Sequence, residues 1–115
     1  MLTLDSNILI AYLNGDEKIA RAFVTWRTAR VGFLISVVTQ IEALSLPNLS
    51  KEEMERIEHF LNEFTIMPLD AQLARIAAEV RRVTLLSLGD SIIVATAQFT
   101  RSALVTNDRE LMRKA

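Results

Sequence analysis

Four acidic residues that lie far apart in the chain each stand where an apolar run meets polar residues. They are Asp5, Glu42, Asp90 and Asp108. Asp5 ends the run that starts at Leu2, Asp108 follows the last apolar run, and the other two acids are expected to open helices. In an open α/β sheet, such positions meet at the carboxyl edge of the strands, where ligands bind. The sequence therefore predicts one site shared by all four acids.

The chemistry of such a site follows from the mutual repulsion of its carboxylates. Two carboxylates about 4 Å apart repel each other by about 4 kcal/mol at an effective dielectric near 20. Mg²⁺ and Mn²⁺ prefer oxygen ligands and would relieve this repulsion; Mg²⁺ typically binds one or two carboxylates, several waters and substrate phosphates. Such an ion activates water and stabilises charge that develops on a phosphodiester. Metal-dependent phosphodiester hydrolysis is the predicted chemistry.

Short apolar runs alternate with longer segments of helical periodicity. The strand-like runs begin at Leu2, Phe33, Thr65 and Ala103. This alternation is the βαβ pattern of a mainly parallel sheet with helices on both faces. We therefore expect a three-layer α/β/α fold around a central sheet of about four strands.

The segments between these runs have the apolar stripes of helices. Residues 16–29 form one predicted helix, in which Trp26 is expected to pack rather than to stack on a base. A capping box at Ser50 predicts the start of another helix, and a third covers about 70–83. Residues 92–97 are apolar nearly all round, so we expect their helix to be buried centrally.

Composition excludes several classes of protein. A chain of 115 residues with 50% apolar content suits a single domain, 1–115. Its 13 basic and 14 acidic residues lack the excess positive charge of a passive nucleic-acid binder. The absence of cysteine excludes disulfides and thiolate zinc sites, and the only histidine, His59, is expected on the surface. Without a basic leader or a long apolar run, a cytoplasmic protein outside the membrane is predicted.

Each acid also has a non-catalytic interpretation. Asp5 could belong to a turn, and Glu42 could be a solvated helix residue. Asp90 could complete a capping box with Ser87, and Asp108 could favour a helix N-terminus through the helix dipole. Four separate coincidences at matching positions are rarer than one site, so the combination favours the shared site.

The stretches around these acids resemble, in order and spacing, the PIN-domain ribonucleases. The stretches are 4–10, 40–44, 88–97 and 104–108. The likeness is strongest to the VapC toxins of toxin-antitoxin pairs, and it covers essentially the whole chain. The resemblance implies that the four acids hold one or two Mg²⁺ or Mn²⁺ ions and that the protein hydrolyses single-stranded or loop RNA.

The same resemblance implies further features. Ser6 and Thr106 would support the acids by hydrogen bonds. A small antitoxin protein would cover the acidic groove, and a homodimer would bury part of the apolar surface. Gly89 stands where many relatives have proline, which is expected to loosen that helix start. The chain ends at Ala115, where relatives usually continue into a final edge strand, so either a short member of the family or a shortened C-terminus is expected.

Other functions fit the residues less well. A phosphotransfer domain of the receiver or haloacid-dehalogenase type also places acids at strand ends and binds Mg²⁺. Residues 5–7 lack the second aspartate of the dehalogenase pattern, and the chain lacks the strand-end lysine of a receiver. An inactive PIN scaffold is disfavoured because all four acids are present, whereas a housekeeping nuclease is kept as an alternative to a toxin.

Overall fold

The computed structural model describes residues 1–114, in which each strand is followed by one or two helices. In chain order the elements are β1 (Leu2–Leu4), α1 (Ser6–Leu13), α2 (Glu17–Thr28), β2 (Phe33–Ser36), α3 (Val37–Leu44), α4 (Lys51–Leu61), β3 (Thr65–Met67), α5 (Ala71–Thr84), α6 (Leu88–Thr100), β4 (Ala103–Val105) and α7 (Arg109–Lys114). The strands form one four-stranded sheet in the order β3-β2-β1-β4, and every pair is parallel. The predicted α/β fold with about four parallel strands is confirmed.

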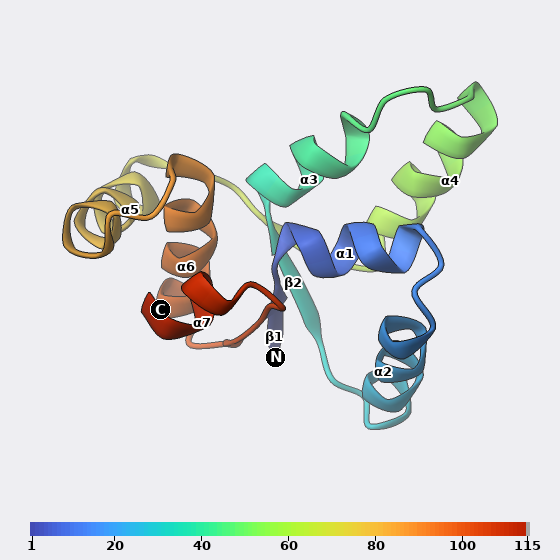
Figure 1. Ribbon diagram of the computed structural model, residues 1–115, viewed down its shortest axis with the longest axis horizontal. Helices are drawn as coiled ribbons and strands as arrows, with labels where there is room; N and C mark the ends of the chain where they lie inside the picture. Colours follow the sequence, from blue (N-terminus) through green and yellow to red (C-terminus); the bar gives the residue numbers. More distant parts are fainter. Residues whose placement is uncertain (115) are drawn as a thin grey trace.

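Helices cover the sheet on both sides, and each side has its own hydrophobic core. Figure 1 shows α5, α6 and α7 on one side and α1, α2 and α4 on the other. The first core contains Leu4, Leu9, Phe23, Ile35 and Ile57, among others. The second contains Leu73, Ala77, Val80, Ile92 and Leu111, among others. Because β1 lies between β2 and β4, the residue that follows it leaves the sheet at an inner strand and is buried.

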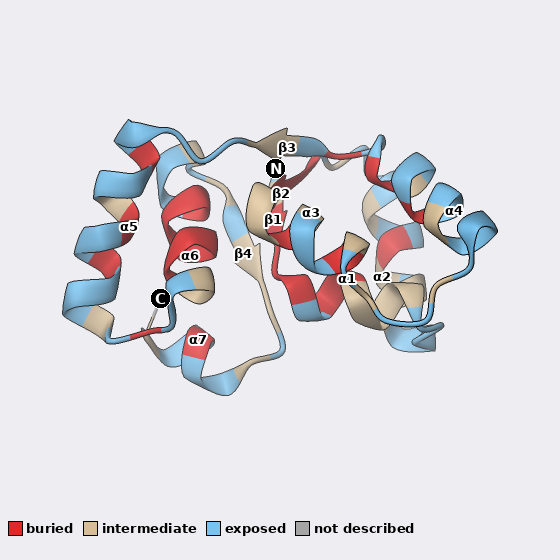
Figure 2. Ribbon diagram, turned by 90° about the horizontal axis from the view of Figure 1, so that it is seen from above, coloured by how far each residue is buried: buried red, intermediate tan, exposed pale blue. Residues whose placement is uncertain are grey.

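Helix α6 is the central helix that its apolar sequence predicts. Its residues from Ser91 to Ala97 are all buried, and Figure 2 shows this run against a mostly exposed α5. Within residues 1–114, no single helix is long and apolar enough to cross a membrane. Only α5 and α6 taken together reach that length and composition, and they are bent by 117° at their junction.

Aromatic side chains fill the core on the α1, α2 and α4 side. Phe23 is fully buried, and its ring centroid lies 4.4 Å from that of Tyr12 and 5.2 Å from that of Phe33. Trp26 meets Phe23 edge-on at 5.5 Å, which confirms packing rather than an exposed stacking surface. His59 is exposed on α4, as predicted.

Local sequence signals set several helix starts. Ser50 and Glu53 form the predicted capping box at the start of α4. The Ser50 bonds lower the pKa of the exposed Glu53 carboxyl, because the charged form accepts them. Asp16 and Asp70 cap α2 and α5 by accepting hydrogen bonds from backbone N–H groups.

Candidate functional site

Asp5 stands at the carboxyl end of β1, at the centre of the sheet. Its backbone N–H donates to the carbonyl of Val105 over 3.0 Å, one step beyond the Leu4–Val105 pair of the ladder. The parallel register therefore places Asp5 beside Thr106, whose hydroxyl donates to Oδ2 of Asp5 over 2.7 Å. Asp5 is the N-cap residue of α1, but its side chain makes no capping bond and is only 3% exposed. This carboxylate is not used to start the helix.

Asp108 is joined to Asp5 through Thr106. The backbone N–H of Asp108 donates to the Thr106 hydroxyl over 3.0 Å. Oδ1 of Asp108 accepts from the N–H groups of Glu110 and Leu111 at 2.9 and 3.2 Å. The helix-start interpretation of Asp108 therefore holds together with its place near Asp5, and its second carboxylate oxygen takes no part in these bonds.

Glu42 reaches the site from within a helix, which corrects the expectation that it opens one. Helix α3 begins at Val37, directly after β2, because Ser36 caps it by accepting from the Val38 N–H. Glu42 is the sixth of its eight residues. Its Oε1 accepts a hydrogen bond of 2.9 Å from the hydroxyl of Ser6, the residue next to Asp5. Glu42 is exposed, as expected of a solvated helix residue, but that interpretation did not include the bond from Ser6.

Asp90 lies in the first turn of α6. Its N–H donates to the Ser87 hydroxyl over 3.2 Å, which is one half of the predicted capping box. Gly89 precedes it inside the helix, so the helix starts ahead of the acid even though proline is absent there. Asp90 is half-buried, and its negative charge raises the pKa of the Asp5 carboxyl.

The electrostatics of Asp5 show how the acids are related. Burial raises the pKa of the Asp5 carboxyl, the hydrogen bond from Thr106 lowers it, and the charges of Asp90 and Asp108 raise it again. The net shift is upward. The ion pairs formed by residues 1–114 are Arg27–Glu63 and Lys114–Glu110, and neither includes any of the four acids. The described part of the chain thus supplies no salt bridge to balance this charge.

The donor set suits a hard divalent cation. Its groups are carboxylate and hydroxyl oxygens, and cysteine is absent from the chain. Among residues 1–114, however, no three Asp, Glu or His side chains are arranged closely enough to hold an ion together. An ion that fits these residues is one bound directly by one or two carboxylates and otherwise through waters, as Mg²⁺ typically is.

Thr39 belongs to this network, although sequence reasoning missed it. The residue is fully buried, and its Oγ1 lies 2.9 Å from Oγ of Ser6. It stands three residues before Glu42, so both side chains lie on the same face of α3. This spacing could be read from the sequence. The contact between Thr39 and Ser6, however, follows only from the packing of α3 against α1.

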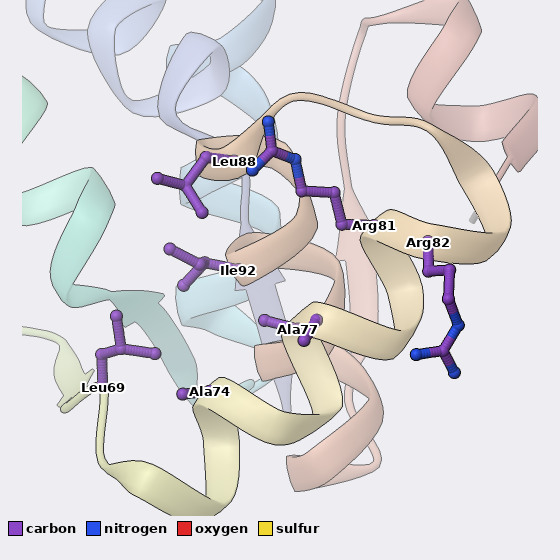
Figure 3. A pocket seen from close by; sticks show the side chains of 8 residues that line it. Leu69, Ala74, Ala77, Arg81, Arg82, Leu88 and Ile92 are labelled. Carbon is purple, nitrogen blue, oxygen red and sulfur yellow. The ribbon is translucent and has the colours of Figure 1, made fainter.

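A separate hollow lies between α5 and α6 (Figure 3). It encloses about 360 Å³, with Ala77, Leu88 and Ile92 among its lining residues and Arg81 at its side. Leu88 and Ile92 are four residues apart on α6, whereas Asp90 lies halfway between them and so on the opposite side of the helix. The apolar hollow and Asp90 thus lie on different faces of α6.

Comparison with known proteins bears on the family and the fold of the chain. A family model for the PIN domain matches residues 2–115. The chain belongs to the PIN domain family. A comparison with curated proteins gives no match. Among solved structures, this PIN domain is similar to a toxin-antitoxin complex from Klebsiella pneumoniae, with 28% identity, a TM-score of 0.83 and coverage of 94% of this chain and 87% of the other.

Two further structures share the fold of this PIN domain. VapBC2 from Rickettsia felis, bound to a DNA fragment from its promoter, has 19% identity and a TM-score of 0.82, with coverage of 97% and 91% of the two chains. FitAcB from Neisseria gonorrhoeae has 22% identity and a TM-score of 0.76, with coverage of 99% and 92%. The family resemblance drawn from the sequence is confirmed.

Proposed function

We propose that this PIN domain is a metal-dependent endoribonuclease and acts in the cytoplasm as the toxin of a toxin-antitoxin pair. The observation that carries the proposal is the buried Asp5 carboxylate, whose pKa is raised by burial and by the charges of Asp90 and Asp108. A repelled carboxylate at the carboxyl edge of a parallel sheet, with no basic partner among the described residues, suits a divalent cation.

The four acids share the proposed metal site. Asp5 and Asp90 hold Mg²⁺ or Mn²⁺ directly or through waters, together with Glu42. Asp108 completes the set or orients a ligand water. When bound, the ion supplies an activated water and offsets the charge that develops on the scissile phosphate.

The surrounding hydroxyls keep the acids in place. Thr106 donates its single proton to Oδ2 of Asp5 and so fixes the orientation of that carboxylate. Ser6 does the same for Glu42 at Oε1. These bonds hold a buried and an exposed carboxylate in fixed orientations, so the chain positions the metal and the substrate rather than supplying a nucleophile.

An RNA cleavage assay tests the proposal. Purified protein is incubated with total RNA in Mg²⁺, in Mn²⁺ and in chelator, and the variants Asp5→Asn and Asp90→Asn are compared with it. We expect cleavage that depends on the cation and is lost in both variants. Asp16→Asn is the matched control, because this exposed helix cap loses the same charge while asparagine caps a helix equally well.

The alternatives give different outcomes in the same experiment. Absence of cleavage with either cation contradicts the nuclease and supports a PIN scaffold used for binding. A phosphoprotein formed on Asp5 with a small phosphodonor would instead support phosphotransfer. Cleavage that survives both substitutions would place the reaction elsewhere in the chain.

The partner proteins are part of the proposal. The similarity to a toxin-antitoxin complex at 28% identity supports a small antitoxin partner. Leu85 and Leu88, at 81% and 59% exposure, support an apolar contact between two copies of the chain. The protein encoded by an adjacent short reading frame should co-purify with this chain and suppress RNA cleavage, and sedimentation velocity of the isolated chain should give a dimer.

A further inference from the structure

A chain of hydroxyl hydrogen bonds links the interior of α3 to the start of α1. Oγ1 of Thr39 lies 2.9 Å from Oγ of Ser6. The Ser6 hydroxyl in turn lies 2.9 Å from Oε1 of Glu42 and donates to it. Thr39 and Ser6 are 0% and 3% exposed, so water does not compete for the bond between their hydroxyls.

The direction of this chain follows from its number of protons. A hydroxyl carries one proton, and an ionised carboxylate only accepts. Because Ser6 gives its proton to Glu42, the bond between the two hydroxyls must use the proton of Thr39. Thr39 therefore donates to Ser6, and Ser6 is left with one orientation for its own proton.

The direction of these hydrogen bonds matters for the position of Glu42, because its side chain is long and exposed. A glutamate side chain has several rotatable bonds, and fixing it in one rotamer costs conformational entropy. Glu42 forms no ion pair with residues 1–114. The hydrogen bond from Ser6 is the one that its carboxylate accepts from the described side chains. The place of this carboxylate thus depends on the orientation of the Ser6 hydroxyl.

We infer that Thr39 is a positioning residue, which fixes the Ser6 proton toward Glu42 and so sets the geometry of the proposed metal-binding carboxylates. The inference rests on the proposed nuclease function for its effect on catalysis. Its structural part, the orientation of Glu42 by Thr39 through Ser6, stands independently of that function.

The test uses variants that separate the hydroxyl from the shape of the side chain. Thr39→Val keeps the branched shape and removes the hydroxyl, whereas Thr39→Ser keeps the hydroxyl. Ser6→Ala and the double variant with Thr39→Val complete a double-mutant cycle. Thr96→Val is the matched control, because Thr96 is also 0% exposed but donates its hydroxyl to the Ile92 carbonyl within α6, over 2.8 Å.

We expect Thr39→Val to lower kcat for RNA cleavage and Mn²⁺ affinity by about tenfold, as loss of a ligand-orienting partner does in metal sites. Mn²⁺ affinity is measured by titration calorimetry without RNA. Thr39→Ser should return both values to within about twofold of the parent, and Thr96→Val should change neither. In the Ser6→Ala background, Thr39→Val should have no further effect, since it acts through Ser6.

Crystal structures of the metal-free parent and of Thr39→Val provide a measurement independent of activity. We expect Glu42 to leave Ser6 in the variant. A Glu42 that keeps its bond to Ser6, or a full Thr39→Val effect in the Ser6→Ala background, overturns the inference. If the parent fails to cleave RNA but Glu42 still moves in the variant, the proposed function fails and the positioning role of Thr39 stands.

Discussion

The hydroxyl of Thr106 donates to Oδ2 of Asp5 over 2.7 Å, although the two residues are 101 positions apart in the chain. The same hydroxyl accepts from the N–H of Asp108, so its proton is directed away from that residue and toward Asp5. Because β1 and β4 are adjacent and parallel, the residues that follow them meet at one edge of the sheet. Thr106 is thus the direct link between the first and the last of the four acids.

Removing this hydroxyl should destabilise the metal-free protein at neutral pH. Thr106→Val leaves a buried carboxylate oxygen without its donor, which typically costs about 1–3 kcal/mol. We expect the free energy of unfolding in urea to fall by that amount at pH 7. Thr106→Ser retains the donor and should recover most of the loss, whereas an equal loss in both variants would assign the effect to the methyl group instead.

The raised pKa of Asp5 gives a pH-dependent prediction. In the folded protein this pKa lies above its ordinary value of 3.8, so the unfolded chain releases its proton first as the pH rises. Stability from this group is therefore present at low pH and is lost as the pH rises through the folded-state pKa. Asp5→Asn, which stays neutral, should make the metal-free protein more stable than the parent at pH 7.

Unfolding in urea between pH 3.5 and 7, with chelator present, checks this sign. The advantage of Asp5→Asn should shrink as the pH falls through the raised folded-state pKa of Asp5, because the parent carboxyl then becomes neutral as well. A variant less stable than the parent at pH 7 would mean that the charged form of Asp5 is favoured in the fold, contrary to its burial and its acidic neighbours.

Sequence patterns predicted the features that depend on neighbouring residues. The Ser50 capping box and the buried face of α5 at Leu73, Ala77 and Val80 follow from spacings of three and four residues. The alternation of runs predicted the parallel sheet, and the ends of strands brought Asp5 and Asp108 to one edge.

Features that depend on how helices dock were beyond those patterns. Glu42 was expected to open a helix, but Ser36 starts α3 earlier and the packing of α3 against α1 brings Glu42 to Ser6. The role of Thr39 depends on the same packing, because a buried threonine in a helix looks like an ordinary core residue until its neighbour is known. That Asp5, Glu42 and Asp90 together hold a metal stays a prediction.

Gly89 offers a test of the start of α6. A Cβ added there would lie 3.6 Å from Cγ1 of Val38, an ordinary van der Waals distance. Gly89→Ala should therefore raise the free energy of unfolding by about 0.5–1 kcal/mol, because alanine loses less backbone freedom in a helix. Gly15→Ala is the contrasting variant. Its φ of +84° disfavours a side chain, so a loss of about 1–2 kcal/mol is expected. If both variants raise or both lower the free energy of unfolding, the described backbone is contradicted.

Phe23 tests whether the fold and the acidic site can be separated. Its ring is fully buried and meets those of Tyr12, Trp26 and Phe33, in the core on the α1, α2 and α4 side. Phe23→Ala should lower the free energy of unfolding by about 3–5 kcal/mol. Val24→Ala, next to it at 62% exposure, should change it by no more than about 0.5 kcal/mol.

The described hydrogen bonds that hold the Asp5 and Glu42 carboxylates come from Thr106 and Ser6, and not from the aromatic core around Phe23. RNA cleavage per folded molecule should therefore be the same in Phe23→Ala as in the parent. The measurement pairs cleavage rates with the folded fraction found by circular dichroism at the same temperature. A rate that falls further than the folded fraction would show that the aromatic core also sets the position of α1, whose first residue, Ser6, holds Glu42.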